Sequence, residues 1–195
     1  MGVIGIVATA LASAGSQPAY PAEAVYAAFT DACADVADLD RARASLAGKG
    51  WEEYQPAADS ETGRIIDRGR SMLAESAPTT KLRPMTAFRR DVAGEHLELV
   101  LSGVEMGHQW INGCRVYDFH ETRSIPPAML ERKFGRAPDE KVEEPDILVK
   151  SMWEPGYRPD HLSTELYFVP EGSPVISLIG ANGICIVAQA SGELQ

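Results

Sequence analysis

The spacing of apolar residues changes at Pro84, and this change constrains the fold more than any other feature of the sequence. Before Pro84, apolar residues recur at helical intervals, as Val25, Phe29 and Cys33 do. After it, apolar and polar residues alternate, most clearly over residues 95–104. Helices followed by consecutive strands with short turns predict an α+β domain, with an antiparallel sheet of about six strands and the N-terminal helices packed on one face.

Local signals place the individual elements. Residues 22–36 form the first predicted helix, Asp38 caps the second, and residues 60–75 form a third that contains two glycines. Residues 85–92 pair with residues 95–104 as a hairpin. A final apolar stretch, residues 175–188, predicts a second and buried hairpin, because Asn182-Gly183 favours a tight turn.

The first residues are typical of an export signal. Residues 3–14 carry no charge, end in the small residues Ala12-Ser13-Ala14, and are too few to cross a hydrocarbon core of about 30 Å. We expect residues 1–14 to be a signal peptide and residues 15–195 to form a single α+β domain that is periplasmic or secreted. No Lys or Arg precedes the apolar run, so a buried N-terminal strand or helix is the alternative.

Charge excludes some partners. The chain has 195 residues, 28 of them acidic and 18 basic, which gives a formal charge of −10 at pH 7. Such a surface repels nucleic acid and anionic lipid headgroups. The uncharged residues 172–192 are interrupted by Gly180-Ala181-Asn182-Gly183, so we expect no integral membrane span after signal removal.

The chain has three cysteines, and an exported protein can oxidise two of them. Cys33 lies on the core face of the first helix and Cys114 begins a predicted strand, so a bridge between them is reasonable. The other two pairings and the absence of a bridge stay open. Cys185, between Ile184 and Ile186, resembles a small buried apolar residue.

A few positions resemble a family. Phe29-x-x-x-Cys33, Gly50-Trp51 and the run Cys-Arg-Val-Tyr-Asp-Phe at residues 114–119 resemble a layout found in small exported bacterial proteins of unknown function. The similarity covers about the first two thirds of the chain. It implies an exported domain, and it carries over no activity and no functional residue.

The densest polar segment, residues 108–121, suggests an enzymatic site. If its second half is extended, Asp118 and His120 share a face and could bind a divalent metal, with His108 or Glu121 as a third ligand. Alternatively, Cys114 could be a nucleophile with a histidine base, a role that a disulfide at Cys114 excludes. The simpler interpretation is that these are solvent-facing strand positions.

Aromatic side chains suggest a binding site instead. Trp110, Trp153 and Tyr157 could line a groove, or they could close the end of the core. Short catalytic and nucleotide-binding signatures are absent from the sequence. The leading hypothesis is a non-enzymatic exported domain, without a cofactor, that binds a small ligand or an envelope protein through the open sheet face or the aromatic loops. A metal-dependent or thiol hydrolase that uses His108, Asp118, His120 or Cys114 is the alternative, and a structural role in an envelope assembly is a third.

Overall fold

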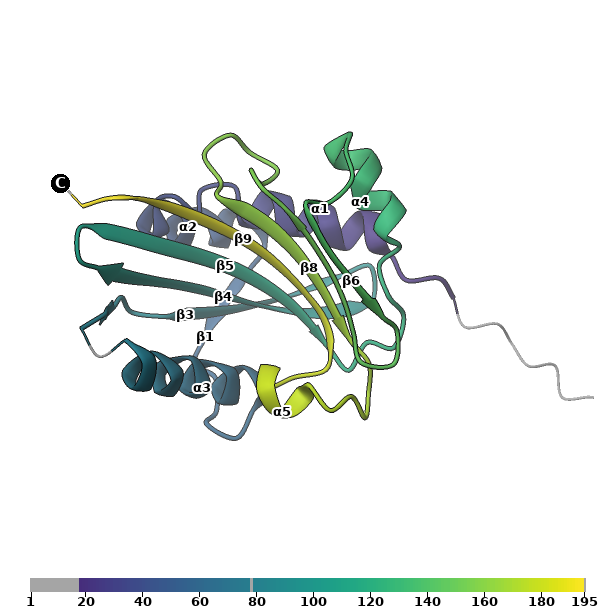
Figure 1. The fold of residues 1–195 in the computed structure, drawn as a ribbon, viewed down its shortest axis with the longest axis horizontal. Coiled ribbons are helices and arrows are strands. Elements are labelled where there is room, and N and C mark those ends of the chain that lie inside the picture. Colours follow the sequence, from purple (N-terminus) through teal and green to yellow (C-terminus); the bar gives the residue numbers. More distant parts are fainter. Residues whose placement is uncertain (1–17, 78, 195) are drawn as a thin grey trace, which may run out of the picture.

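One antiparallel sheet of nine strands organises the part of the chain that the structure describes (Figure 1). The computed structural model describes residues 18–77 and 79–194, so the expected signal peptide lies outside the described residues. The α+β class is confirmed. The sheet is larger than the six strands that the sequence predicts, and helices lie on both of its faces rather than on one.

The strands follow the alternation of the sequence after Pro84. Their bounds are β1 (Glu52–Tyr54), β2 (Lys81–Leu82), β3 (Thr86–Val92), β4 (Glu95–Met106), β5 (Gln109–Phe119), β6 (Glu140–Glu144), β7 (Leu148–Trp153), β8 (Ser163–Val169) and β9 (Gly183–Glu193). Their spatial order is β1-β3-β4-β5-β9-β8-β7-β6, with β2 also paired to β4. The predicted hairpin of β3 and β4 is confirmed, and it turns at Ala93-Gly94. The long strands β4, β5 and β9 lie at the centre.

One face of the sheet carries the hydrophobic core. The helices α1 (Ala22–Ala32), α2 (Leu39–Leu46) and α4 (Pro127–Phe134) lie along this face, and a short 3₁₀ helix, η1 (Ala47–Lys49), follows α2 (Figure 1). Asp38 is the N-cap of α2, as predicted, because its carboxylate accepts a hydrogen bond from the Arg41 backbone N–H. Phe29 is fully buried, as are Leu97 and Leu99 of β4. These side chains belong to one hydrophobic core between the helices and the sheet.

The opposite face is covered by α3 (Glu61–Ser76) and by α5 (Ile176–Ile179), one short turn of helix (Figure 1). Polar contacts attach the first turn of α3 to the sheet: Thr62 donates a hydrogen bond to the Glu98 carboxylate on β4, and Glu61 pairs with His120 after β5. In the part of the chain that the structure describes, no helix is both long and apolar enough to cross a membrane.

The predicted C-terminal hairpin is wrong. Its first half forms α5 within the connection between β8 and β9, and Gly180 ends this helix with a φ of 96°. Strand β9 pairs with β5 and β8 instead. Short apolar runs rich in β-branched residues do not distinguish a strand from a helical turn by periodicity.

A disulfide joins the two layers of the core. Cys33 follows α1, Cys114 lies on β5, and their Cα atoms are 5.6 Å apart. This confirms the first of the predicted pairings and leaves Cys185 as a free thiol. Because the bond links residues 81 positions apart, it restricts the unfolded chain strongly.

We expect reduction of this disulfide, or the double substitution Cys33→Ala with Cys114→Ala, to lower the free energy of unfolding by about 4 kcal/mol. Denaturant titration with and without reductant measures the difference. Cys185→Ala is the control, because the loss on reduction is expected to be the same in that variant. Three titratable thiols in the denatured, unreduced protein would contradict the pairing.

Candidate functional site

A cavity of about 430 Å³ lies between α3 and α5 on one side and the face of β5, β8 and β9 on the other. Its lining comes from distant parts of the chain: Ile65, Arg68, Gly69 and Met72 on α3; Arg115 and Tyr117 on β5; Glu165, Tyr167 and Val169 on β8; Leu178 and Ile179 on α5; Ala181 and Asn182; and Gly183, Ile184, Cys185, Val187 and Gln189 on β9. The walls are mostly apolar. This size and lining lie within the usual range for small-molecule sites.

The cavity continues under the C-terminal half of α3. A second space of about 310 Å³ reaches Leu73, Val100 and Ile111, and it shares five lining residues with the first: Ile65, Gly69, Arg115, Tyr117 and Gln189. At the rim, Met72 and Leu178 are 51% and 63% exposed, which is unusual for such large apolar side chains. The cavity therefore has a long interior and an apolar rim.

Gly69 keeps the cavity wide. A Cβ atom placed on Gly69 would meet nothing within 4 Å, although the residue lies inside α3, where glycine costs about 1 kcal/mol relative to alanine. The other glycine of α3 differs: a Cβ on Gly63 would lie 2.1 Å from the carbonyl oxygen of Ala57. Close packing explains Gly63. At Gly69, the missing side chain leaves open space.

Two guanidinium groups line the first cavity. Arg115 donates a hydrogen bond of 2.7 Å from Nη1 to the hydroxyl of Ser102 on β4. The Nε of Arg68 is buried and has no hydrogen-bond partner. Among residues 18–77 and 79–194, no carboxylate oxygen lies within ion-pair distance of either guanidinium group. Both arginines are half-buried, and a buried donor such as the Arg68 Nε normally has an acceptor, so the lack of one requires a reason.

The acidic and thiol groups of the cavity are already engaged or inert. The Glu165 carboxylate accepts hydrogen bonds from Ser163, from the Tyr167 hydroxyl and, at 2.9 Å, from the Gln189 amide. Burial raises the pKa of the Cys185 thiol to about 12, so the thiol is protonated at neutral pH. Burial also raises the pKa of Tyr167 well above its usual value.

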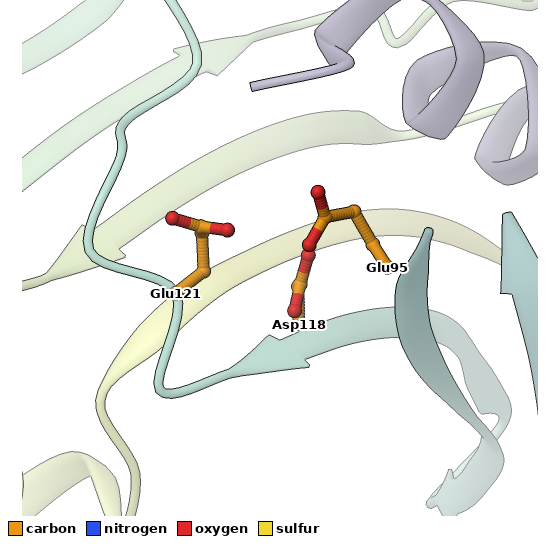
Figure 2. Close-up of side chains that lie close together, drawn as sticks. All are labelled: Glu95, Asp118 and Glu121. Carbon is orange, nitrogen blue, oxygen red and sulfur yellow. The ribbon is translucent and has the colours of Figure 1, made fainter. Parts of the chain in front are cut away.

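A separate group of carboxylates lies at the other face of the sheet (Figure 2). Oxygen atoms of Glu95, Asp118 and Glu121 lie within 4.8 Å of one another, an arrangement that could hold a metal ion. Arg123 is already among them: its guanidinium group donates to the Glu121 carboxylate and, at 2.8 Å, to Glu95. The arginine thus provides the positive charge that a metal would bring.

Asp118 carries the unusual titration in this cluster. Burial raises its pKa to about 6, the charges of Glu95 and Glu121 add to the rise, and a hydrogen bond of 2.8 Å from the Tyr20 hydroxyl opposes it. Arg123 lies over the Tyr20 ring and also donates to the Pro18 carbonyl oxygen. The cluster therefore attaches the residues before α1 to the end of β5.

Of the sequence-predicted metal ligands, Asp118 and Glu121 are brought together, whereas His108 and His120 lie apart from them. His108 lies in the turn before β5 and His120 follows the other end of this 11-residue strand. His120 has a φ of 61°, so the extended backbone ends before it and its imidazole pairs with Glu61 beneath α3. Asp118 lies on the core side with Glu95. The Cys114 sulfur is in the disulfide, so it is not available as a nucleophile.

The sequence-predicted aromatic residues lie in or against the core. Trp153 is fully buried and its ring stacks on Phe134 at 4.6 Å between centroids. The Tyr157 hydroxyl donates to the Thr30 carbonyl oxygen of α1. Trp110 packs against the backbone of β9 at Gly192. None of the three lines the cavity under α3.

A broad depression of about 560 Å³ lies beside the Tyr157 loop and is open at the surface. It is lined by five residues: Asp139, Glu154, Pro155, His161 and Leu162. His161 is 2% exposed, and burial lowers the pKa of its imidazole. The depression lacks the enclosure that a small ligand requires.

One residue in the sequence could have indicated the cavity face, although the alternation of apolar residues alone did not. Arg115 falls on the strand side that carries Tyr117, so an apolar-looking face contains a charge. No family model, curated protein or solved structure matches the chain.

The acidic cluster yields a prediction about pH. Between about pH 4 and pH 6, folded Asp118 binds more protons than unfolded Asp118, so its destabilising effect grows as the pH rises and is complete above pH 6. Asp118→Asn keeps an acceptor for Tyr20 and removes the charge. We expect it to raise the free energy of unfolding by about 2 kcal/mol at pH 7.5 and to change it little at pH 4.

Denaturant titration at the two pH values measures this effect. The exposed Asp146→Asn is the matched control, for which we expect a change of less than about 0.5 kcal/mol at either pH. Equal destabilisation by Asp118→Asn at both pH values would contradict the assignment.

Proposed function

We propose that the protein is an exported, non-enzymatic binding domain that holds a small, mainly apolar molecule in the cavity under α3 and α5. The observation that carries this proposal is the open space at Gly69. This position inside α3 could hold a larger side chain without a clash, yet it carries no side chain. The space that this leaves joins two cavities with apolar walls. Proteins normally fill such space, because each missing contact costs stability.

The chemistry of the lining favours binding over catalysis. A catalytic acid, base or nucleophile needs a pKa close to the working pH and free access to a substrate. Cys185 has a pKa of about 12, and the Glu165 carboxylate already accepts three hydrogen bonds. These groups can shape and line a site, but they are poorly placed to react.

The coverage of the sheet favours a small ligand over an envelope protein. Helices α3 and α5 lie across the sheet face that we expected from the sequence to be open (Figure 1), and the cavity lies between these helices and the sheet. A protein partner would need a broad exposed surface. A small molecule needs only an opening into the cavity, such as the rim at Met72 and Leu178.

A periplasmic or secreted location belongs to the same proposal. The N-terminal apolar run and the resemblance to small exported bacterial proteins support it. The Cys33–Cys114 disulfide is compatible with an oxidising compartment, where such bonds persist.

The uncharged dye N-phenyl-1-naphthylamine, which fluoresces in apolar surroundings, tests the proposal. We expect the dye to bind the full-length protein. We expect Gly69→Leu to weaken this binding about tenfold or more, because the leucine side chain would fill the part that the two cavities share. The same substitution is expected to stabilise the fold by about 1 kcal/mol, since leucine is a better helix former than glycine. Fluorescence titration and thermal unfolding measure the two effects.

Ser71→Leu is the matched control, because Ser71 is exposed on α3 and does not line the cavities. We expect it to leave dye binding unchanged. Dye binding that is absent in the native protein, or equal in native protein and Gly69→Leu, would rule out the proposed site.

A further inference from the structure

We propose that the ligand of this cavity is a single-chain amphiphile with an anionic headgroup, such as an alkyl carboxylate, whose headgroup is bound by Arg68 and Arg115. This inference rests on the proposed function and specifies its ligand class. The two guanidinium groups come from opposite walls, one from α3 and one from β5, and both line the first cavity. Guanidinium groups match the planar geometry of a carboxylate and donate two parallel hydrogen bonds to it.

Arg115 is held in place before any ligand binds. Its Nη1 donates to Ser102 on the neighbouring strand. The guanidinium group also lies over Gly113, where a Cβ would come within 2.5 Å of Nη1. The missing side chain of Gly113 thus provides the place that this group fills. A donor fixed in advance loses little freedom on binding, which favours affinity.

Arg68 faces the cavity with an unused donor. Its stem packs beside Gly180, where a Cβ would lie 3.4 Å from the Arg68 Cδ, so the C-terminal end of α5 holds the side chain in position. Its Nε is buried and donates no hydrogen bond. A buried guanidinium nitrogen without an acceptor is costly, and an anionic oxygen would satisfy it.

The charge around the site is opposite to that of the whole molecule. The chain carries a formal charge of −10, yet two arginines line the cavity, and no carboxylate among the described residues lies in ion-pair contact with either of them. Glu165 is the only acidic residue among the described residues that line the first cavity. Its carboxylate accepts hydrogen bonds from neighbouring side chains, and the Lys150 Nζ lies 3.9 Å from it. Elsewhere the basic residues mostly pair with acidic ones, as Arg123 does with Glu95.

The rest of the cavity suits an alkyl chain. Ile65, Tyr117 and Val187 provide apolar walls beside the arginines, and the second space extends past Ile66 and Leu73 toward Val104. Because Arg115 lines both spaces, a headgroup bound to it can direct the chain along either one. Burial of each methylene group contributes about 0.8 kcal/mol, so chain length adds to affinity.

Calorimetric titration of the delipidated, full-length protein tests the ligand class without a reporter dye. The probes are decanoate, 1-decanol and decylamine, which share an alkyl chain and differ in headgroup charge. We expect decanoate to bind at least about tenfold more tightly than decanol, a difference of 1.4 kcal/mol, and decylamine to bind more weakly than decanol. Arg68→Gln and Arg115→Gln are each expected to remove most of the preference for decanoate and to leave decanol binding nearly unchanged.

Arg64→Gln is the control on the same helix, since Arg64 is exposed and does not line the cavities. Thermal unfolding confirms that each variant is folded. Arg68 is only half-buried and makes no ion pair among the described residues, so Arg68→Gln is informative even if Arg115→Gln unfolds. Equal affinity for decanoate and decanol, or equal losses for both in the variants, overturns this inference and leaves the proposed function standing. Absence of binding by all three probes together with absence of dye binding overturns both.

Discussion

Alternation along β5 divides this molecule into two unlike halves. Cys114 and Val116 point to one face of the sheet, where α1 and α2 cover the hydrophobic core and a disulfide joins the layers. Arg115 and Tyr117 point to the other face, where α3 and one turn of α5 cover a sheet wider than they can fill. Because side chains on a strand must alternate, the same central strands serve stability on one face and a cavity on the other.

The cavity face shows the signs of a compromise with stability. Gly69 weakens α3, Arg68 has a buried nitrogen without an acceptor, and large apolar side chains at the rim are exposed. Each feature costs free energy that the closed core on the opposite face offsets. Binding sites commonly retain such unfavourable features, because a ligand uses the space and the donors that folding leaves unsatisfied.

Local signals in the sequence predicted much of the half that contains α1, α2 and the hydrophobic core. The helical spacing at Phe29, the cap at Asp38 and the alternation over residues 95–104 all appear in the structure. The site could not be predicted in this way, because its walls come from residues 65–72, 115–117 and 165–189. Its assembly depends on strand order. The metal hypothesis likewise assumed that the strand continues through His120, and the left-handed backbone there ends it.

We propose that the ligand lies under α3 and α5 and not elsewhere on the molecule. Nuclear magnetic resonance with isotope-labelled protein and unlabelled decanoate measures this most directly, through contacts between the alkyl protons and protein methyl groups. Contacts to Ile65, Ile179 and Val187, with none to Leu97 or Leu99 in the closed core, are the result we predict. Contacts confined to the core face or to the surface depression near Leu162, or no contacts at saturating decanoate, would contradict it.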